Sequence, residues 1–270
     1  MNKIPMAPAR TVVFIHGLWI HSGSWQPWQE LFAGRGYETH APGWPGDAES
    51  VAATRADPTG MHGVGVEEAT DAYAKFLAGL DERPILVGHS FGGLIAQKLL
   101  DRDLAAGAVT ISPAPIKGVR AVPFSLLRSA FPVLRSPANR SRAVALTEKQ
   151  FAYGFGNALT PAESSDIYRR VAIPAPGRPL FEVSSANFTR DAPSAVDTAR
   201  ADRAPLLMIA CGRDHTVPAV VVRGAHRLYA RSRARTDLVE FPGRGHSAPL
   251  DRGWRELAET SLTWIGTHTA

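Results

Sequence analysis

The chain has 270 residues, of which 44% are hydrophobic, and this is enough for one large domain with a sizeable core. No apolar run reaches the roughly 20 residues that a membrane-spanning helix needs, and residues 1–10 lack the apolar centre of a signal peptide, so we expect a cytoplasmic protein with no membrane-inserted segment. The single cysteine, Cys211, excludes an intramolecular disulfide and a cysteine-based metal cage.

The positive charge does not predict a nucleic-acid partner. The net charge is +5, and only five of the 30 basic residues are lysine. The densest basic stretch, Arg223–Arg235, spreads its charges around a predicted helix and loop, as a solvated face does.

Strands and helices alternate along most of the chain. Apolar runs that end in Gly or Pro predict buried strands, and runs with a 3.6-residue apolar period predict helices. In chain order we expect strands at 11–17, 37–46 (where the strand runs into a turn), 84–88, 107–113, 205–212 and 236–243. We expect helices at 27–36, 65–80, 91–102, 218–231 and 253–266. This alternation predicts an α/β fold with a doubly wound, mostly parallel sheet of about six strands.

The segment 114–200 breaks the alternation. Ten of the 21 prolines fall between Pro113 and Pro193, and no strand there is followed by a crossover helix. Because a structureless loop of this length is implausible, we expect a helical cap or lid over the sheet. The remaining residues, 1–113 and 201–270, then form the core domain. The cap carries several aromatic side chains: Phe124, Phe131, Phe151, Tyr153, Phe155 and Tyr168.

The stretch Gly88-His89-Ser90-Phe91-Gly92 fits the pattern G-x-S-x-G between a predicted strand and a predicted helix. Side chains at 88 and 92 would collide in so tight a turn, so glycine is needed at both positions. The turn presents the Ser90 hydroxyl at the carboxyl edge of the sheet, where ligands bind in open α/β folds. This context indicates a nucleophile.

A serine nucleophile needs a base, and the base needs an acid to orient it. Asp214, in "GRDHTVP", follows the fifth predicted strand, and His246, in "GRGHSAP", follows the sixth. Both therefore lie at the same sheet edge as Ser90. We expect a catalytic triad of Ser90, His246 and Asp214.

An oxyanion hole needs two donors. The amide of Phe91 opens a helix, where it points toward developing negative charge. The second donor comes from the loop after the first strand: the Leu18 amide is the first candidate and that of Trp19 the second.

The segments "HGLW", "GHSFGG", "GRDHTVP" and "GRGHS" together resemble an α/β-hydrolase-fold serine hydrolase over nearly the whole chain. Within that superfamily the chain is similar to the esterase, methylesterase and hydroxynitrile lyase group. The resemblance has departures: the turn "APGWPGD" places Trp44 near the expected pocket wall. The lyases of the group typically have Thr and Lys where this chain has Leu18 and Ser247, which disfavours a lyase.

The expected reaction is the hydrolysis of a carboxylic ester or lactone with a largely apolar part, through an acyl-enzyme. Two alternatives stay open: other chemistry on the same fold, namely carbon–carbon bond hydrolysis, lyase activity or acyl transfer, and a non-catalytic small-molecule receptor. No metal or cofactor is expected, because the histidines lack metal spacing and "GVGVEE" lacks the strand that precedes a dinucleotide motif. His16 and His89 are expected to be structural. Our candidates for the substrate pocket are Trp19, Trp44, Phe151 and Phe155.

Overall fold

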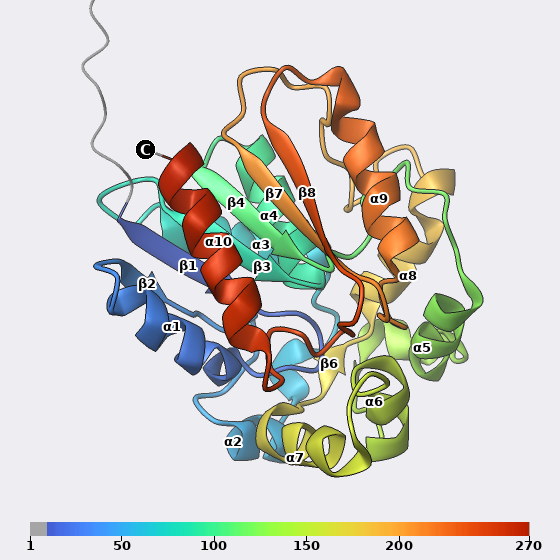
Figure 1. Ribbon diagram of the computed structural model, residues 1–270. Helices are drawn as coiled ribbons and strands as arrows, with labels where there is room; N and C mark the ends of the chain where they lie inside the picture. The colour runs from blue at the N-terminus through green and yellow to red at the C-terminus, as the bar shows by residue number, and fades with distance from the viewer. Residues whose placement is uncertain (1–9, 270) are drawn as a thin grey trace, which may run out of the picture.

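A six-stranded parallel sheet forms the centre of the protein in the computed structural model, which describes residues 10–269 (Figure 1). The strand order is β2-β1-β3-β4-β7-β8, so the chain winds outward in both directions from β1 and β3. The strands are β1 (Thr11–Ile15), β2 (Glu38–His40), β3 (Ile85–His89), β4 (Gly107–Ile111), β7 (Leu206–Cys211) and β8 (Thr236–Phe241).

The register of the sheet aligns its carboxyl ends. Val13 pairs with Leu86, Leu86 with Ala108, and Ala108 with Leu206. Strands of similar length that start in one row also end in one row. The loops that follow β1, β3, β7 and β8 therefore meet at one edge.

Alternate residues of each central strand enter two different cores. Val13, Leu86 and Met208 belong to one apolar cluster, whereas Val12 and Val87 belong to the other. A strand buried on both faces reads as a continuous apolar run, which explains the pattern of the sequence. Helices cover both faces of the sheet, as Figure 1 shows. They are α1 (Gln26–Ala33) and α10 (Trp254–His268) on one face and α3 (Val66–Leu77), α4 (Phe91–Asp101) and α9 (Ala219–Leu228) on the other.

We call residues 114–200 the cap. They connect β4 to β7, and the helices α5, α6 and α7 gather at the end of the sheet where the strands finish (Figure 1). The cap contains α5 (Phe124–Leu134), α6 (Glu148–Gly154), α7 (Pro161–Val171) and α8 (Arg178–Ser185), with short 3-10 turns at Pro137–Ser141 and Ala186–Phe188. It also contains a two-stranded antiparallel sheet, β5 (Ala143–Val144) and β6 (Ala175–Pro176).

The expected doubly wound sheet is confirmed, and the differences are local. The segment 37–46 was expected to be a strand that runs into a turn; the strand covers Glu38–His40, and Pro42 and Pro45 beyond it cannot donate ladder hydrogen bonds. The short helix α2 (Val51–Ala56) was not expected; the Ser50 side chain caps it by accepting from the Ala53 amide. Further 3-10 turns occur at Ser22–Trp25, Thr59–Met61 and Tyr229–Arg231.

Candidate active site

Ser90 lies in a strained turn between β3 and α4. Its backbone angles are φ 55° and ψ −120°, a conformation that a residue with a side chain rarely adopts. Such strain persists only where the surrounding structure enforces it, and it concentrates at functional sites. The side chain of Ser90 reaches a cavity beneath the cap, although the residue is only 4% exposed.

The glycines on either side of Ser90 make this turn possible. A Cβ at Gly88 would collide with the carbonyl of Gly92, and a Cβ at Gly92 would collide with the carbonyl of Ile15 in β1. Gly17 approaches from the loop after β1, and a Cβ there would lie 2.7 Å from the Cβ of Ser90. The backbone of the first loop is therefore packed directly against the serine.

Asp214 and His246 form a buried pair in the loops that follow β7 and β8. The Oδ2 atom of Asp214 lies 2.6 Å from Nδ1 of His246, and neither side chain is exposed. The Oδ1 atom of Asp214 accepts from the amides of Thr216 and Val217, at 2.8 and 2.7 Å. The carboxylate is thus fixed from two sides and holds the imidazole ring in one orientation.

The other nitrogen of His246 is left free. Nε2 is buried and has no hydrogen-bond partner among residues 10–269. The ring of His246 packs edge-on against that of Phe155, with 4.7 Å between the ring centroids. The centroid of the His89 ring lies 4.6 Å from that of His246. His246 therefore lies beside the residue that precedes Ser90, with an unpaired nitrogen and with Nδ1 held by a carboxylate.

His89 is expected to remain neutral. Burial, and then the nearby His246, lower the pKa of His89 well below its ordinary value. The ring of His89 was expected to be structural, and it contacts the ring of His246.

Three backbone amides near Ser90 are available to a ligand. The backbone N–H groups of Leu18, Trp19 and Phe91 have no hydrogen-bond acceptor among residues 10–269. Leu18 directly follows Gly17, which touches Ser90, and Phe91 opens α4. Trp19 has a positive φ of 64°, so the loop turns sharply after Leu18.

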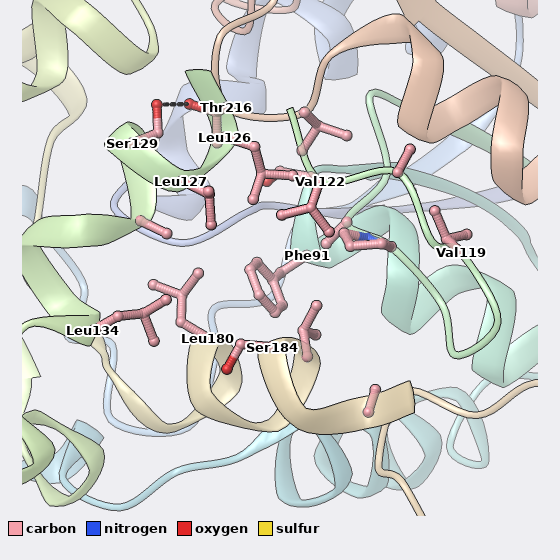
Figure 2. Close-up of a pocket in the computed structure, with 18 of the residues that line it drawn as sticks. Phe91, Val119, Val122, Leu126, Leu127, Ser129, Leu134, Leu180, Ser184 and Thr216 are labelled. Atoms are coloured by element: carbon pink, nitrogen blue, oxygen red, sulfur yellow. Dashed lines mark hydrogen bonds between the residues drawn. The ribbon is translucent and has the colours of Figure 1, made fainter. Parts of the chain in front are cut away.

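Ser90 and Phe91 open into a cavity of about 190 Å³ between α5 and α8. In Figure 2, Phe91 stands in the centre, with Leu126 and Leu127 of α5 on one side and Leu180 of α8 on the other. The wall is mostly apolar, as small-molecule sites usually are. The polar side chains along it are Ser90, Ser129, Ser184, Asn187 and Thr216.

Of the four expected pocket residues, only Trp19 lines this cavity. Trp44 does not: its buried indole donates to the carbonyl of His16 at 3.0 Å. Nε2 of His16 lies 3.0 Å from Oδ2 of Asp47, and its Nδ1 lies 2.9 Å from the carbonyl oxygen of Gly17. Both contacts agree with the structural role expected for His16. Trp44 therefore helps to hold the loop that packs against Ser90.

Phe151 and Phe155 do not line the cavity either. Their four-residue spacing does bring the rings together, stacked with centroids 4.6 Å apart. Phe155 packs against His246, and Phe151 continues into the cap against Tyr168. This cavity therefore gives no support to the expectation that these two rings face the substrate.

Sequence reasoning missed the apolar lining of the cavity. Leu126, Ala130 and Leu134 lie on one side of α5 at four-residue spacing, and Leu180 and Val183 lie on α8. The signal in the sequence that identifies them is the helical spacing of apolar residues in the cap.

Other nucleophiles and metal ligands are not gathered here. Burial raises the pKa of Cys211 to about 12, so its thiol stays protonated. Within residues 10–269 no group of three or more His, Cys, Asp or Glu side chains is arranged to hold a metal ion.

Comparisons with known proteins agree with this architecture. A family model described as the alpha/beta hydrolase family matches residues 12–260. A comparison with curated proteins returned no match.

Solved structures of similar fold include three hydrolases. A monoacylglycerol lipase from Paleococcus ferrophilus is 25% identical, with a TM-score of 0.70 over 97% of this chain and 96% of that one. An extracellular alpha/beta-hydrolase from a Paenibacillus species is 20% identical, with a TM-score of 0.67 over 94% and 98%. A methylesterase from Arabidopsis is 16% identical, with a TM-score of 0.63 over 95% and 99%.

Proposed function

The chain belongs to the alpha/beta hydrolase family, and we propose that it hydrolyses a carboxylic ester or lactone with Ser90, His246 and Asp214 as its catalytic triad. One observation carries the proposal: Ser90 is held in a strained turn, and its neighbour His89 contacts His246, whose Nδ1 is bound to a buried carboxylate and whose Nε2 is free. A base that takes the proton of a serine needs one ring nitrogen free and the other held in place, and Nδ1 and Nε2 of His246 meet these two needs.

In the proposed reaction, Oγ of Ser90 attacks the ester carbonyl carbon while its proton passes to Nε2 of His246. The carbon–oxygen bond to the leaving group then breaks, and His246 gives the proton to the departing alkoxide. Water, deprotonated by His246, attacks the acyl carbon; the bond from that carbon to Oγ of Ser90 then breaks, and His246 returns the proton to Oγ as the acid leaves. Asp214 stabilises the imidazolium in both halves and takes no proton itself.

The carbonyl oxygen becomes negative in each tetrahedral intermediate. We propose that the amides of Phe91 and Leu18 bind it, with Trp19 as the alternative to Leu18. Such donors are effective because they are fixed before the charge develops.

The apolar cavity supports a substrate with an apolar acyl or alcohol part. Trp19, Leu126 and Leu180 would contact that part, and their burial by substrate contributes binding at about 25 cal/mol per Å². The lined volume lies on the cap side of Ser90, so the cap is proposed to determine substrate choice.

The test is reaction with a fluorophosphonate probe, followed by mass mapping of the labelled peptide. The expected label lies on Ser90. Hydrolysis of p-nitrophenyl esters of increasing acyl length should then be measured for wild type and Ser90→Ala. The variant should lose about 10⁴-fold or more in kcat while its circular dichroism stays unchanged.

Ser184→Ala is the matched control, because Ser184 is another hydroxyl on the cavity wall. It should keep most of the activity. A label on another serine, or a Ser90→Ala variant that keeps a tenth of the rate, would show that the nucleophile is misassigned. If Ser90 is labelled but no ester is hydrolysed, and candidate substrates give other products, the result would favour carbon–carbon hydrolysis, lyase or transfer chemistry. If the protein binds a small molecule without labelling or turnover, the result would favour a receptor.

A further inference from the structure

Helix α5 of the cap exposes an apolar face. Phe124, Leu127 and Phe131 are 76%, 48% and 62% exposed, and their spacing of three and four residues places them on one side of the helix. Val122, just before the helix, is 58% exposed. Large apolar side chains gathered on one exposed face indicate an interaction surface.

The same part of the chain is strongly basic. From Leu104 to Thr147 the sequence contains no Asp or Glu. Five arginines there are exposed, and none of them forms an ion pair within the described residues 10–269: Arg120, Arg128, Arg135, Arg140 and Arg142. Arg135 directly follows α5, and Arg120 lies four residues before it.

This surface adjoins the cavity that contains Ser90. Val122 and Leu127 line the cavity and are also among the exposed apolar residues, while Phe124 and Phe131 do not line it. Figure 2 shows Val122, Leu126 and Leu127 together on the α5 side of the cavity. The wall of the cavity and the exposed face of α5 thus adjoin on one helix, and Leu127 belongs to both.

We propose that the exposed face of α5, with the arginines around it, docks the protein onto an anionic lipid surface. An amphipathic helix that lies in the plane of a bilayer buries its apolar side between the acyl chains, while basic side chains meet anionic head groups. An apolar substrate dissolved in the lipid could then reach the cavity without crossing water. The docking needs no spanning segment, and none of the described helices is long and apolar enough to cross a bilayer.

A second copy of the chain is a poorer occupant. A symmetric contact through this face would bring the same arginines of both copies together, with no acidic residue between Leu104 and Thr147 to neutralise them. Charge complementarity therefore favours an anionic surface over self-association.

The experiment is co-sedimentation with vesicles, using the Ser90→Ala protein so that hydrolysis cannot change the lipid. We expect binding to vesicles of phosphatidylcholine with one third phosphatidylglycerol, weaker binding to pure phosphatidylcholine, and a decrease with added salt. Because catalysis is not measured, failure of this proposal is separate from failure of the proposed triad.

Three double variants then test the surface. Phe124→Ser with Phe131→Ser should weaken vesicle binding by roughly tenfold or more, since two apolar anchors are lost. Arg120→Glu with Arg135→Glu should weaken it by about 25-fold or more on anionic vesicles, at about fivefold for each charge removed. Arg231→Glu with Arg233→Glu is the matched control: these arginines are exposed but precede β8, at the amino end of the sheet, and binding should be nearly unchanged.

Hydrolysis of a water-soluble p-nitrophenyl ester should be the same in the Phe124/Phe131 variant as in wild type, which shows that the fold is intact. Equal binding to anionic and neutral vesicles, or equal loss in the Arg231/Arg233 control, would overturn the proposal. So would a dimer, detected by light scattering, that the Phe124/Phe131 variant dissociates without any change in vesicle binding.

Discussion

At the scale of single residues, the two carboxylate oxygens of Asp214 have different partners: Oδ1 accepts from two backbone amides, and Oδ2 lies against His246. One substitution can separate these two roles. In Asp214→Asn the amide oxygen can still accept from Thr216 and Val217, so the loop should hold its shape. The new NH₂ group cannot accept from Nδ1 of His246, and the imidazole loses its orientation. We expect kcat to fall about 10³–10⁴-fold with little change in the melting temperature.

The measurement is steady-state hydrolysis of a short p-nitrophenyl ester beside thermal unfolding. Thr216→Ala provides a comparison, because it removes a neighbouring side chain and leaves the carboxylate in place. Full activity in Asp214→Asn would mean that another acid orients the base.

His89 should make the folded protein sensitive to acid. Burial holds its pKa well below the ordinary value of 6.5, so the folded state stays neutral there while the unfolded chain takes up a proton. The unfolded state then binds more protons below about pH 6.5, and stability falls as the pH falls, by up to about 1.4 kcal/mol per pH unit. Above that pH the contribution is constant.

Urea unfolding at pH 5 and pH 7 measures this effect. In His89→Gln the difference in unfolding free energy between the two pH values should shrink by about 1–2 kcal/mol relative to wild type. An unchanged difference would mean that His89 gains its proton in the folded state as readily as in the unfolded one.

At the scale of elements, α5 and α6 have different tasks although both belong to the cap. Phe155, at the end of α6, covers His246, whereas Leu126 of α5 faces the cavity. Phe155→Ala should therefore lower kcat for all esters by a similar factor and cost about 3–5 kcal/mol of stability. Leu126→Ala should lower kcat/KM roughly ten- to a hundredfold for long acyl esters and much less for the acetate.

A series of p-nitrophenyl esters from acetate to decanoate, measured for both variants, decides the matter. Phe155→Leu keeps most of the packing volume and should recover most of the rate. If Phe155→Ala discriminated by acyl length and Leu126→Ala did not, Phe155 rather than Leu126 would be the residue that contacts the acyl chain.

The sequence predicted the core elements well because their signals are local. A buried parallel strand such as β3 is a continuous apolar run, and the glycines at 88 and 92 are required by backbone contacts inside the same turn. The cap was harder. Phe155 packs against His246, which comes about 90 residues later in the chain. No local sequence pattern encodes that contact. Trp44 was likewise misread, since its partner His16 comes from a different loop.

At the scale of the whole molecule, the cap shares its apolar core with the sheet. Phe151 and Ile167 of the cap belong to the same buried cluster as Leu86 and Met208. We therefore expect the proposed core domain and cap to unfold together. Tryptophan fluorescence, which includes Trp19 beneath the cap, and far-ultraviolet circular dichroism should give one coincident urea transition. Two separated transitions would show that the cap melts on its own.

The wall of the cavity and the proposed catalytic residues come from different segments of the chain. The proposed triad follows β3, β7 and β8, whereas most lining residues lie between Ala114 and Asn187. A mutational library confined to that interval would vary the shape of the site and leave the proton-transfer apparatus untouched. Transplanting the interval from one relative to another should then move substrate preference with it, so that new specificities can arise without the chemistry being invented again.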